Sequence, residues 1–294
     1  MNLAGLQSWG GLAGATPESA AVAVAGIPYD GSAVYRKGAA AAPARIRELS
    51  SVMPPVTEDG ASLLGLAVDD IGDLDAGRSI ESGWRAIADC LASIPPAAVL
   101  TVIGGDHCAA IPVLAAQVRR HPDLRVAWID AHPDLCNFSR GGAWTCGCAL
   151  RRTLEVGGLD PARVAFAGGR DYDLEEVKFI ADHSQLMIGA REVVADPEEA
   201  GRRLGRKLSG GPVHVSFDID VLDPAFAPGT EIPSAGGIST RAALDLLRGL
   251  GEEVELVGLD VMEVAPPLDH NDVTSLAALK LIFEFWGHAW KPPT

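Results

Sequence analysis

The sequence predicts an α/β protein, a three-layer α/β/α sandwich with a central, mostly parallel sheet of eight strands. Three observations support this expectation. Short apolar and β-branched runs alternate with segments of helical periodicity, which is the pattern of parallel βαβ units. The chain of 294 residues is 48% hydrophobic and 21% charged, which is typical of a globular protein with a substantial core. Acidic residues and histidines directly follow several apolar runs, where sheets of this class bind ligands.

Each expected element corresponds to its own apolar run or periodic segment. In chain order, strands are expected at residues 21–27, 66–70, 99–103, 125–130, 163–167, 185–188, 213–220 and 255–260. Helices, recognised by apolar residues recurring every three or four positions, are expected at 44–50, 81–92, 108–119, 149–155, 174–182, 198–208, 241–250 and 273–290. No low-complexity linker and no internal repeat divides this alternation. Residues 1–294 are therefore expected to form a single domain.

The charge and composition exclude some classes of partner. The chain has 24 Lys and Arg residues against 39 Asp and Glu, a net charge of −15, whereas a nucleic-acid-binding protein needs a basic surface. No apolar run approaches the roughly 18 residues that cross a bilayer. The first basic residue, Arg36, lies too late for a secretory signal, and the five cysteines are odd in number, as expected of free thiols. We expect a cytoplasmic protein that binds neither nucleic acid nor membranes.

Polar residues suited to catalysis follow four of the expected strands. The four segments are GGDH at 104–107, DAHPD at 130–134, DIDVLDP at 218–224 and DVME at 260–263. Each segment alone has an ordinary explanation as turn chemistry. Because the carboxyl ends of parallel strands lie at one edge of the sheet, four such segments together indicate a site there.

The spacing within two of these segments indicates a metal centre. In an extended segment side chains alternate with period 2, so Asp130, His132 and Asp134 are expected to point one way, as are Asp218 and Asp220. Four clustered carboxylates repel one another unless cations compensate their charge. Two divalent ions that share bridging carboxylates and keep open positions for water are the simplest arrangement. The oxygen-rich ligand set with two imidazoles favours Mn²⁺, although Fe, Co, Ni or Zn would also suit it.

These motifs resemble those of the ureohydrolases, the arginase and agmatinase superfamily. The order and spacing of GGDH at 104–107, DAHPD at 130–134 and SFDIDVLDP at 216–224 are similar to its three metal-binding motifs. The segments at 26–30, 38–47 and 70–73 resemble the N-terminal half of agmatinase-like members. The resemblance covers nearly the whole chain. It implies an arginase-like fold and a homotrimer or homohexamer.

The resemblance also implies a reaction and a set of site residues. A hydroxide bridging two Mn²⁺ ions would attack the guanidino group of a small cationic compound, agmatine-like or arginine-like, and release urea and an amine. Asp220 is implied to stabilise the intermediate and to pass a proton to the leaving amine. Glu263 is implied to pair with the guanidinium through charge-assisted hydrogen bonds. The implied ligands are His107, Asp130, Asp134 and Asp218 for one ion and Asp130, His132, Asp218 and Asp220 for the other, with Asp130 and Asp218 bridging.

Three positions depart from the family pattern. Cys146 stands where a catalytic or substrate-contacting histidine is expected, and a thiol of ordinary pKa cannot be the same proton shuttle, so substrate contact and plain packing both stay open. Glu231 in TEIP at 230–233 replaces a glycine and adds a carboxylate that would favour a cationic substrate or face solvent. Asp173 in GRDYD at 169–173 resembles an arginase residue near an α-amino group. These loops leave the choice between agmatine-like and amino-acid substrates open.

Two alternatives to a guanidino hydrolase follow from these departures. One is a hydrolase of the same fold that acts on another carbon–nitrogen bond, such as a formimino group. The other is a metal-binding relative that has lost turnover. The presence of all six expected ligands and of Glu263 favours an enzyme. The histidines without ligand spacing are expected to be surface or packing residues: His121, His183, His214, His270 and His288.

Overall fold

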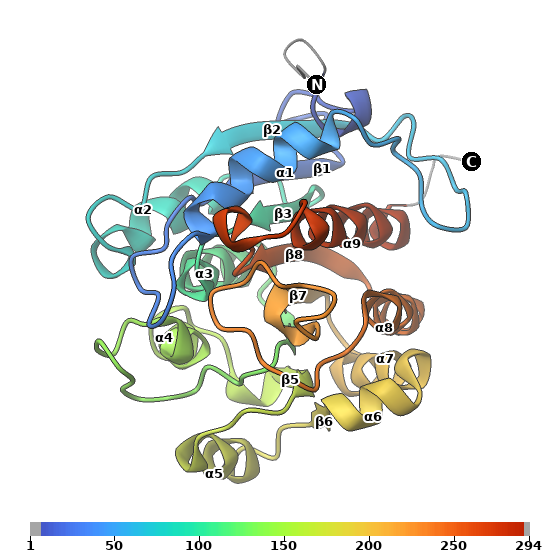
Figure 1. Ribbon diagram of the computed structural model, residues 1–294. Coiled ribbons are helices and arrows are strands. Elements are labelled where there is room, and N and C mark those ends of the chain that lie inside the picture. The colour runs from blue at the N-terminus through green and yellow to red at the C-terminus, as the bar shows by residue number, and fades with distance from the viewer. Residues whose placement is uncertain (1–6, 291–294) are drawn as a thin grey trace.

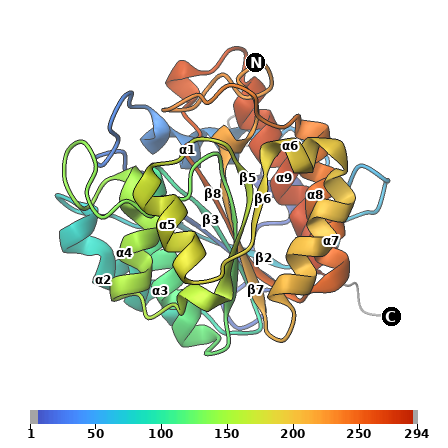
Figure 2. The ribbon, with the colours of Figure 1, turned by 90° about the horizontal axis from the view of Figure 1, so that it is seen from below.

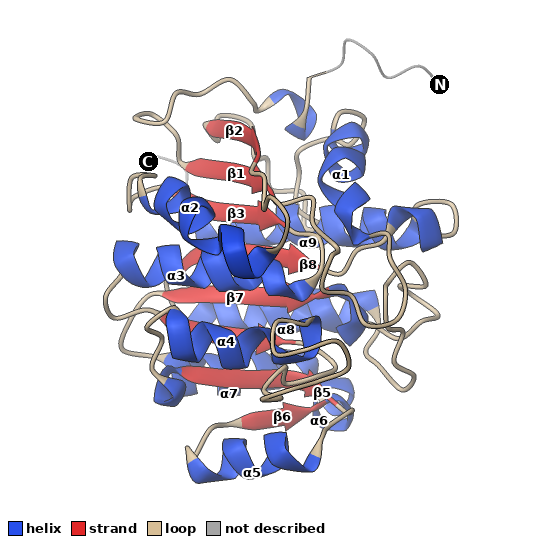
Figure 3. Ribbon diagram, turned by 90° about the vertical axis from the view of Figure 1, so that its left-hand side faces the viewer, coloured by secondary structure: helices blue, strands red, loops and turns tan. Residues whose placement is uncertain are grey.

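A single eight-stranded sheet forms the centre of the molecule, as a computed structural model that describes residues 7–290 shows (Figures 1 and 3). The strand order is β2-β1-β3-β8-β7-β4-β5-β6 and every neighbouring pair is parallel. The expected sandwich is confirmed, and the sheet is parallel throughout. The strands are β1 Val22–Gly26, β2 Val68–Asp73, β3 Val99–Ile103, β4 Arg125–Ile129, β5 Val164–Gly169, β6 Met187–Gly189, β7 Val213–Asp218 and β8 Leu256–Met262.

Helices cover both faces of the sheet, which Figure 2 shows nearly edge-on. Helices α2 to α5 lie on one face, and α1 and α6 to α9 lie on the other. Within residues 7–290, no helix is both long and apolar enough to cross a membrane. The helices are α1 Ala42–Ser50, α2 Ile80–Ala92, α3 Ala110–Arg120, α4 Ala149–Val156, α5 Leu174–Asp182, α6 Ala190–Ala195, α7 Pro197–Leu208, α8 Thr240–Glu253 and α9 Val273–Ala289.

The side-chain alternation of the strands divides the interior into two hydrophobic cores. In β1, Val22 and Val24 pack into the core under α1 and α9, whereas Ala23 and Ala25 pack into the core under α2 and α3. All five residues of this strand are buried. Strands buried on both faces have nearly continuous apolar sequences. They can therefore be recognised in the sequence even though apolar and polar residues do not alternate along them.

Most element ends differ from the expected ranges by a few residues, and one helix and two strand ends differ in ways that matter for the site or the layout. The helix α6 is absent from the expected list because its six residues directly follow β6 and end two residues before Pro197, where the next helix starts. The strand β4 ends at Ile129 and β7 ends at Asp218, where a 3₁₀ turn follows. The motifs at 130–134 and 218–224 therefore begin where the extended backbone stops.

Candidate active site

The four polar segments lie together because their strands are neighbours in the sheet. Strands β3, β8, β7 and β4 are consecutive in the strand order, and all run parallel. The turns that follow them therefore leave the sheet at the same edge, which is the carboxyl edge where α/β proteins bind ligands. After β3 the chain enters a 3₁₀ turn at His107, and the Asp106 carboxylate caps it by accepting the N–H of Cys108 at 3.1 Å.

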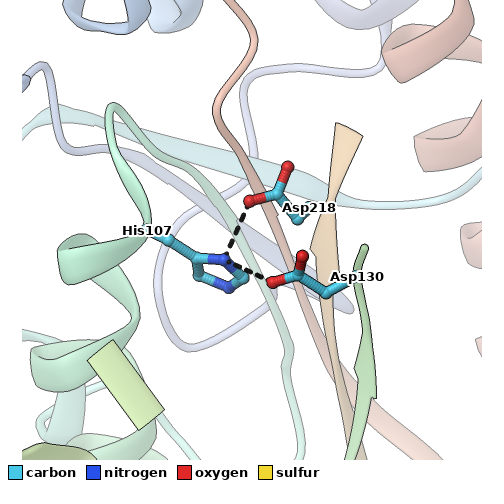
Figure 4. A group of neighbouring side chains, drawn as sticks. All are labelled: His107, Asp130 and Asp218. Carbon is cyan, nitrogen blue, oxygen red and sulfur yellow. Dashed lines mark hydrogen bonds and ion pairs between the residues drawn. The ribbon is translucent and has the colours of Figure 1, made fainter. Parts of the chain in front are cut away.

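One group of possible metal ligands surrounds the Nδ1 atom of His107 (Figure 4). This atom lies 3.0 Å from an Asp218 oxygen, 3.1 Å from an Asp130 oxygen and 3.3 Å from an Asp134 oxygen. The side chain of His107 is 0% exposed and that of Asp218 is 4% exposed. Three strand ends thus direct their donors at one buried point.

A second group adjoins the first through a shared carboxylate. The Nδ1 atom of His132 lies 3.1 Å from an Asp220 oxygen and 3.5 Å from the Oδ1 atom of Asp130. Asp130 therefore faces both histidines, one with each carboxylate oxygen. All six residues expected to bind metal from the sequence lie in this cluster. That Asp130 and Asp218 each bridge two metal ions stays a prediction.

The convergence of the ligands arises from tight turns, and the expectation that they alternate along an extended segment is wrong. The Asp130 carboxylate accepts the N–H of His132 at 2.7 Å, and the Asp218 carboxylate accepts the N–H of Asp220 at 2.8 Å. Asp134 has a φ of 53°, in the left-handed region. Aspartate tolerates that conformation and readily accepts hydrogen bonds from a residue two positions on, so the motif forms its own turns.

The ring of His107 is held in one orientation. It stacks on the indole of Trp128 with centroids 4.1 Å apart and planes 5° from parallel. Its Nε2 atom lies 3.0 Å from the hydroxyl of Ser216, which leaves Nδ1 for the carboxylates. The indole N–H of Trp128 donates to Asp130 at 3.0 Å. The ligands are therefore positioned by surrounding side chains, as is usual for metal sites in proteins.

The electrostatics of the cluster call for cations. Burial raises the pKa of Asp134 and Asp218 well above the usual range, and their carboxylate neighbours raise it further. Burial lowers the pKa of His107, but hydrogen bonding to Asp130 and the charges of the nearby carboxylates raise it overall, to about 9. A cluster that draws protons in this way also draws divalent cations, and its oxygen and imidazole donors suit such ions. The residues present thus fit a pair of metal ions.

Four residues of the cluster, His132, Asp134, Asp218 and Asp220, line a cavity of about 350 Å³. Glu263, Cys146 and Asp173 also line this cavity, as expected for residues that face a substrate. Glu263 has a φ of 63° directly after β8, and one of its carboxylate oxygens has no hydrogen-bond partner. Among residues 7–290, Arg140 is the one Lys or Arg side chain in the wall. Sequence reasoning missed Arg140, because a single arginine in a glycine-rich loop has no distinguishing pattern.

The thiol of Cys146 faces the cavity but is poorly suited to proton transfer. The residue is 6% exposed and begins a 3₁₀ turn ahead of α4. Burial raises its pKa well above the ordinary thiol value, and the nearby carboxylates, Glu263 first, raise it further. Cys146 is therefore a neutral thiol in the wall. Its place in the cavity favours substrate contact over packing away from it.

Two other acidic residues from the sequence analysis have different surroundings. Glu231 is 1% exposed and does not line the cavity; one oxygen accepts the N–H of Ala39 at 3.3 Å and the other has no partner. Asp173 lines the cavity and caps α5, and it accepts the Cys136 thiol at 3.5 Å. Asp173, Cys136 and Glu176 form a third group of possible metal ligands. Both oxygens of Glu176, however, already accept backbone N–H groups.

Together with the similarities given next, the parallel sheet and its two adjoining carboxylate and imidazole groups define a ureohydrolase, a hydrolase of guanidino carbon–nitrogen bonds. The chain belongs to the arginase family, whose model matches residues 20–287. It is 36% identical over 282 residues to the guanidinopropionase of Pseudomonas aeruginosa, covering 91% of this chain and 86% of that protein. It is 31% identical to the agmatinase of Bacillus anthracis, covering 91% of both. The proclavaminate amidinohydrolase structure from Streptomyces clavuligerus superposes with a TM-score of 0.89 at 31% identity, covering 98% of both chains.

Proposed function

We propose that the protein is a binuclear manganese amidinohydrolase that cleaves the guanidino group of a small compound to urea and an amine. The observation that carries this proposal is the position of Asp130, whose two oxygens face the two histidines of adjoining ligand groups beneath one cavity. The relatives named guanidinopropionase and agmatinase support a guanidino substrate. The oxygen-rich donor set supports Mn²⁺.

The ligand cluster would hold two Mn²⁺ ions. When bound, they supply an acidified water for attack on a guanidinium carbon. Asp130 and Asp218 would be shared between the ions. The ligand sets are His107, Asp130, Asp134 and Asp218 for one ion and Asp130, His132, Asp218 and Asp220 for the other.

The remaining side chains would bind the substrate and move a proton. Glu263 lines the cavity and has one buried carboxylate oxygen without a hydrogen-bond partner, and it would hold the guanidinium by a charge-assisted hydrogen bond. Asp220, which also lines the cavity, would stabilise the charge that develops and pass a proton to the leaving amine. Cys146 would contact the substrate as a neutral thiol. Asp173 would line the cavity wall, and Glu231, whose charge raises the pKa of Glu263, would add negative charge near the site.

The wall of the cavity supports a substrate that carries a carboxylate at the end remote from the guanidinium. Arg140 lines the cavity and is exposed, so its guanidinium is free to pair with such a group. An Arg140→Ala variant is then expected to raise KM for guanidinopropionate and guanidinobutyrate about tenfold, with little change for agmatine. The exposed Arg119→Ala serves as a matched control. An equal effect on the acids and on agmatine would assign Arg140 no role in selection.

The reaction itself is tested by product analysis of the Mn²⁺-loaded protein. Urea would be measured with agmatine, arginine, guanidinobutyrate, guanidinopropionate and guanidine, and formamide with a formimino compound. We expect urea and the matching amine in equal amounts from at least one guanidino compound. Formamide without urea would instead support the alternative hydrolase of formimino groups, and no product from a protein holding two ions would support a non-catalytic relative.

We further propose that the chain is a single domain, residues 1–294, that acts as a cytoplasmic homotrimer or homohexamer. All five cysteines are free thiols, in keeping with a reducing compartment. Light scattering on the purified protein is expected to give three or six times the chain mass of 30.6 kDa. A mass of one or two chains would contradict the proposed assembly.

A further inference from the structure

A continuous chain of buried polar side chains leads away from His107 into the core between the sheet and α3. The Nε2 atom of His107 lies 3.0 Å from the Ser216 hydroxyl, which donates to Asp260 at 2.7 Å. The other Asp260 oxygen lies 2.8 Å from the Nε2 atom of His214. The Nδ1 atom of His214 lies 3.0 Å from the Gln117 amide nitrogen. All five residues have 0% exposure.

The direction of each hydrogen bond is determined by the groups at the two ends. Arg120 is only a donor, so the Gln117 oxygen accepts from it and the Gln117 nitrogen donates to Nδ1 of His214. The Nε2 atom of His214 then carries its proton and donates to Asp260.

The hydrogen bonds of Asp260 extend this order to His107. Asp260 also accepts from Ser216, so the Ser216 oxygen accepts from Nε2–H of His107. The Nε2 atom of His107 is thereby committed to Ser216, and the Nδ1 atom faces the carboxylates.

The backbone is shaped to accommodate this chain. His214 and Ser216 lie two residues apart on β7 and so share a face, and Ser216 is directly opposite Asp260 on β8. Gly258 lies opposite His214 in the same register. A Cβ atom at Gly258 would lie 2.3 Å from Nδ1 of His214 and 2.2 Å from the Gln117 nitrogen. Only glycine therefore allows the histidine and the glutamine to meet here.

We propose that His214 and Asp260 are positioning residues that set the affinity of the metal position built around His107. They act through Ser216. His214 donates a hydrogen bond to the Asp260 carboxylate and so fixes its position. Asp260 in turn accepts from the Ser216 hydroxyl, whose oxygen accepts from His107. This inference rests on the proposed metal centre. Loss of such an outer partner typically lowers metal affinity 10–100-fold. Within residues 7–290, His132 makes no hydrogen bond to these buried side chains, so the position built around it, which shares Asp130 with the first, is expected to keep most of its affinity.

The proposal is tested by Mn²⁺ binding to metal-free protein. Binding is measured by titration calorimetry and by elemental analysis after dialysis. His214→Phe removes the donor to Asp260 while keeping a ring, and His214→Gln keeps an N–H in the place of Nε2. We expect His214→Phe to bind one ion normally and the other about tenfold or more weakly. His214→Gln is expected to bind both ions nearly as the unaltered protein does.

The control is Thr101→Val, which removes another buried hydrogen bond, the one that the Trp286 indole donates to Thr101 at 2.9 Å. If this variant weakens Mn²⁺ binding as His214→Phe does, the hydrogen bonds from His214 to His107 have only a structural role and the proposal is overturned. Unchanged binding in His214→Phe, or equal weakening in His214→Gln, overturns it as well. Should His214→Phe not fold, Gln117→Leu is expected to weaken the same position by a smaller factor, and unchanged binding in it counts against the proposal. Absence of Mn²⁺ binding by the unaltered protein would refute the proposed metal centre itself.

Discussion

The carboxylate of Glu263 accepts the backbone N–H of His107 at 2.7 Å. In return, the N–H of Glu263 donates to the carbonyl of Gly105 at 2.9 Å. The turn that follows β8 is thus joined to the turn that follows β3, and the group proposed to hold the substrate is fixed relative to the metal cluster. One Glu263 oxygen makes this structural contact, and the other is buried without a hydrogen-bond partner.

Glu263→Gln keeps the acceptor for His107 but removes the negative charge that pairs with the substrate. A hydrogen bond to a charged group contributes about 1.5–3 kcal/mol, so kcat/KM for the preferred guanidino substrate is expected to fall roughly 10- to 150-fold. Metal content, determined by elemental analysis, is expected to stay at two ions per chain. Unchanged kcat/KM would remove Glu263 from substrate binding.

Asp130→Asn is expected to lose metal because Asp130 contributes to both ligand groups. An amide is a weaker ligand than a carboxylate and leaves the cluster with one charge fewer to hold two cations. Elemental analysis of the Mn²⁺-loaded variant should give fewer than two ions per chain, with urea release reduced at least 100-fold. Asp123→Asn, whose side chain is 78% exposed, is the control and should retain both ions. Two tightly bound ions in Asp130→Asn would exclude a bridging role.

Cys146→His restores the residue type that the family resemblance leads one to expect in the cavity wall. If the family histidine aids proton transfer or substrate contact, kcat or kcat/KM for an ordinary guanidino substrate should rise several-fold, with a new group titrating near neutral pH. Steady-state kinetics from pH 6 to pH 9 would measure this. Cys146→Ser, which keeps the size and hydrogen-bonding type, should stay close to the unaltered enzyme. If neither variant changes the kinetics, Cys146 has only a packing role.

The ion pair between Arg47 and Asp70 makes stability depend on pH. Arg47 donates to both Asp70 oxygens, at 2.8 and 2.9 Å. Burial alone raises the pKa of Asp70, but the hydrogen bonds from Arg47 and Trp9 outweigh it and lower the pKa overall. The stabilisation is therefore complete above the ordinary pKa of aspartate, about 3.9, and is lost as the pH falls through the lower pKa of the folded state.

Asp70→Asn is accordingly expected to lower the free energy of unfolding by about 1.5–3 kcal/mol at pH 7. The difference from the unaltered protein should shrink as the pH falls below about 4, as measured by urea unfolding. Asp89→Asn, at a side chain that is 68% exposed, should cost less than about 1 kcal/mol. A difference for Asp70→Asn that is the same at pH 3 and pH 7 would contradict the role of the ion pair.

The sequence predicts the sheet well because its strands are buried on both faces and so appear as continuous apolar runs. All eight expected strands are present, with ends shifted by a few residues. The short helix α6 escapes prediction because a six-residue segment that follows a strand and contains two consecutive valines resembles further strand or turn. Its helical form comes instead from packing, since Val193 is fully buried in the core beneath α7 and α8.

The identity of the candidate ligands could be predicted from the sequence, but the way they converge could not. The Asp130 and Asp218 carboxylates each accept the backbone N–H of the residue two positions on and so form tight turns. The period-2 alternation of an extended segment does not predict such turns. His214 could not be recognised at all, because its partners Asp260 and Gln117 are remote in sequence and come together only through the strand register and the packing of α3. Spacing identifies local ligand motifs, whereas the groups that orient them depend on tertiary contacts.

The central claim is that the paired ligand groups around Asp130 hold two ions which together support cleavage of a guanidino group. Its most direct test is stepwise addition of Mn²⁺ to metal-free protein, with bound metal and the rate of urea release measured in the same samples. The account predicts that little urea forms with one ion per chain and that the rate rises as the second ion binds. Full activity in metal-free or one-ion protein, or no urea from protein holding two ions with any guanidino compound tested, would contradict it.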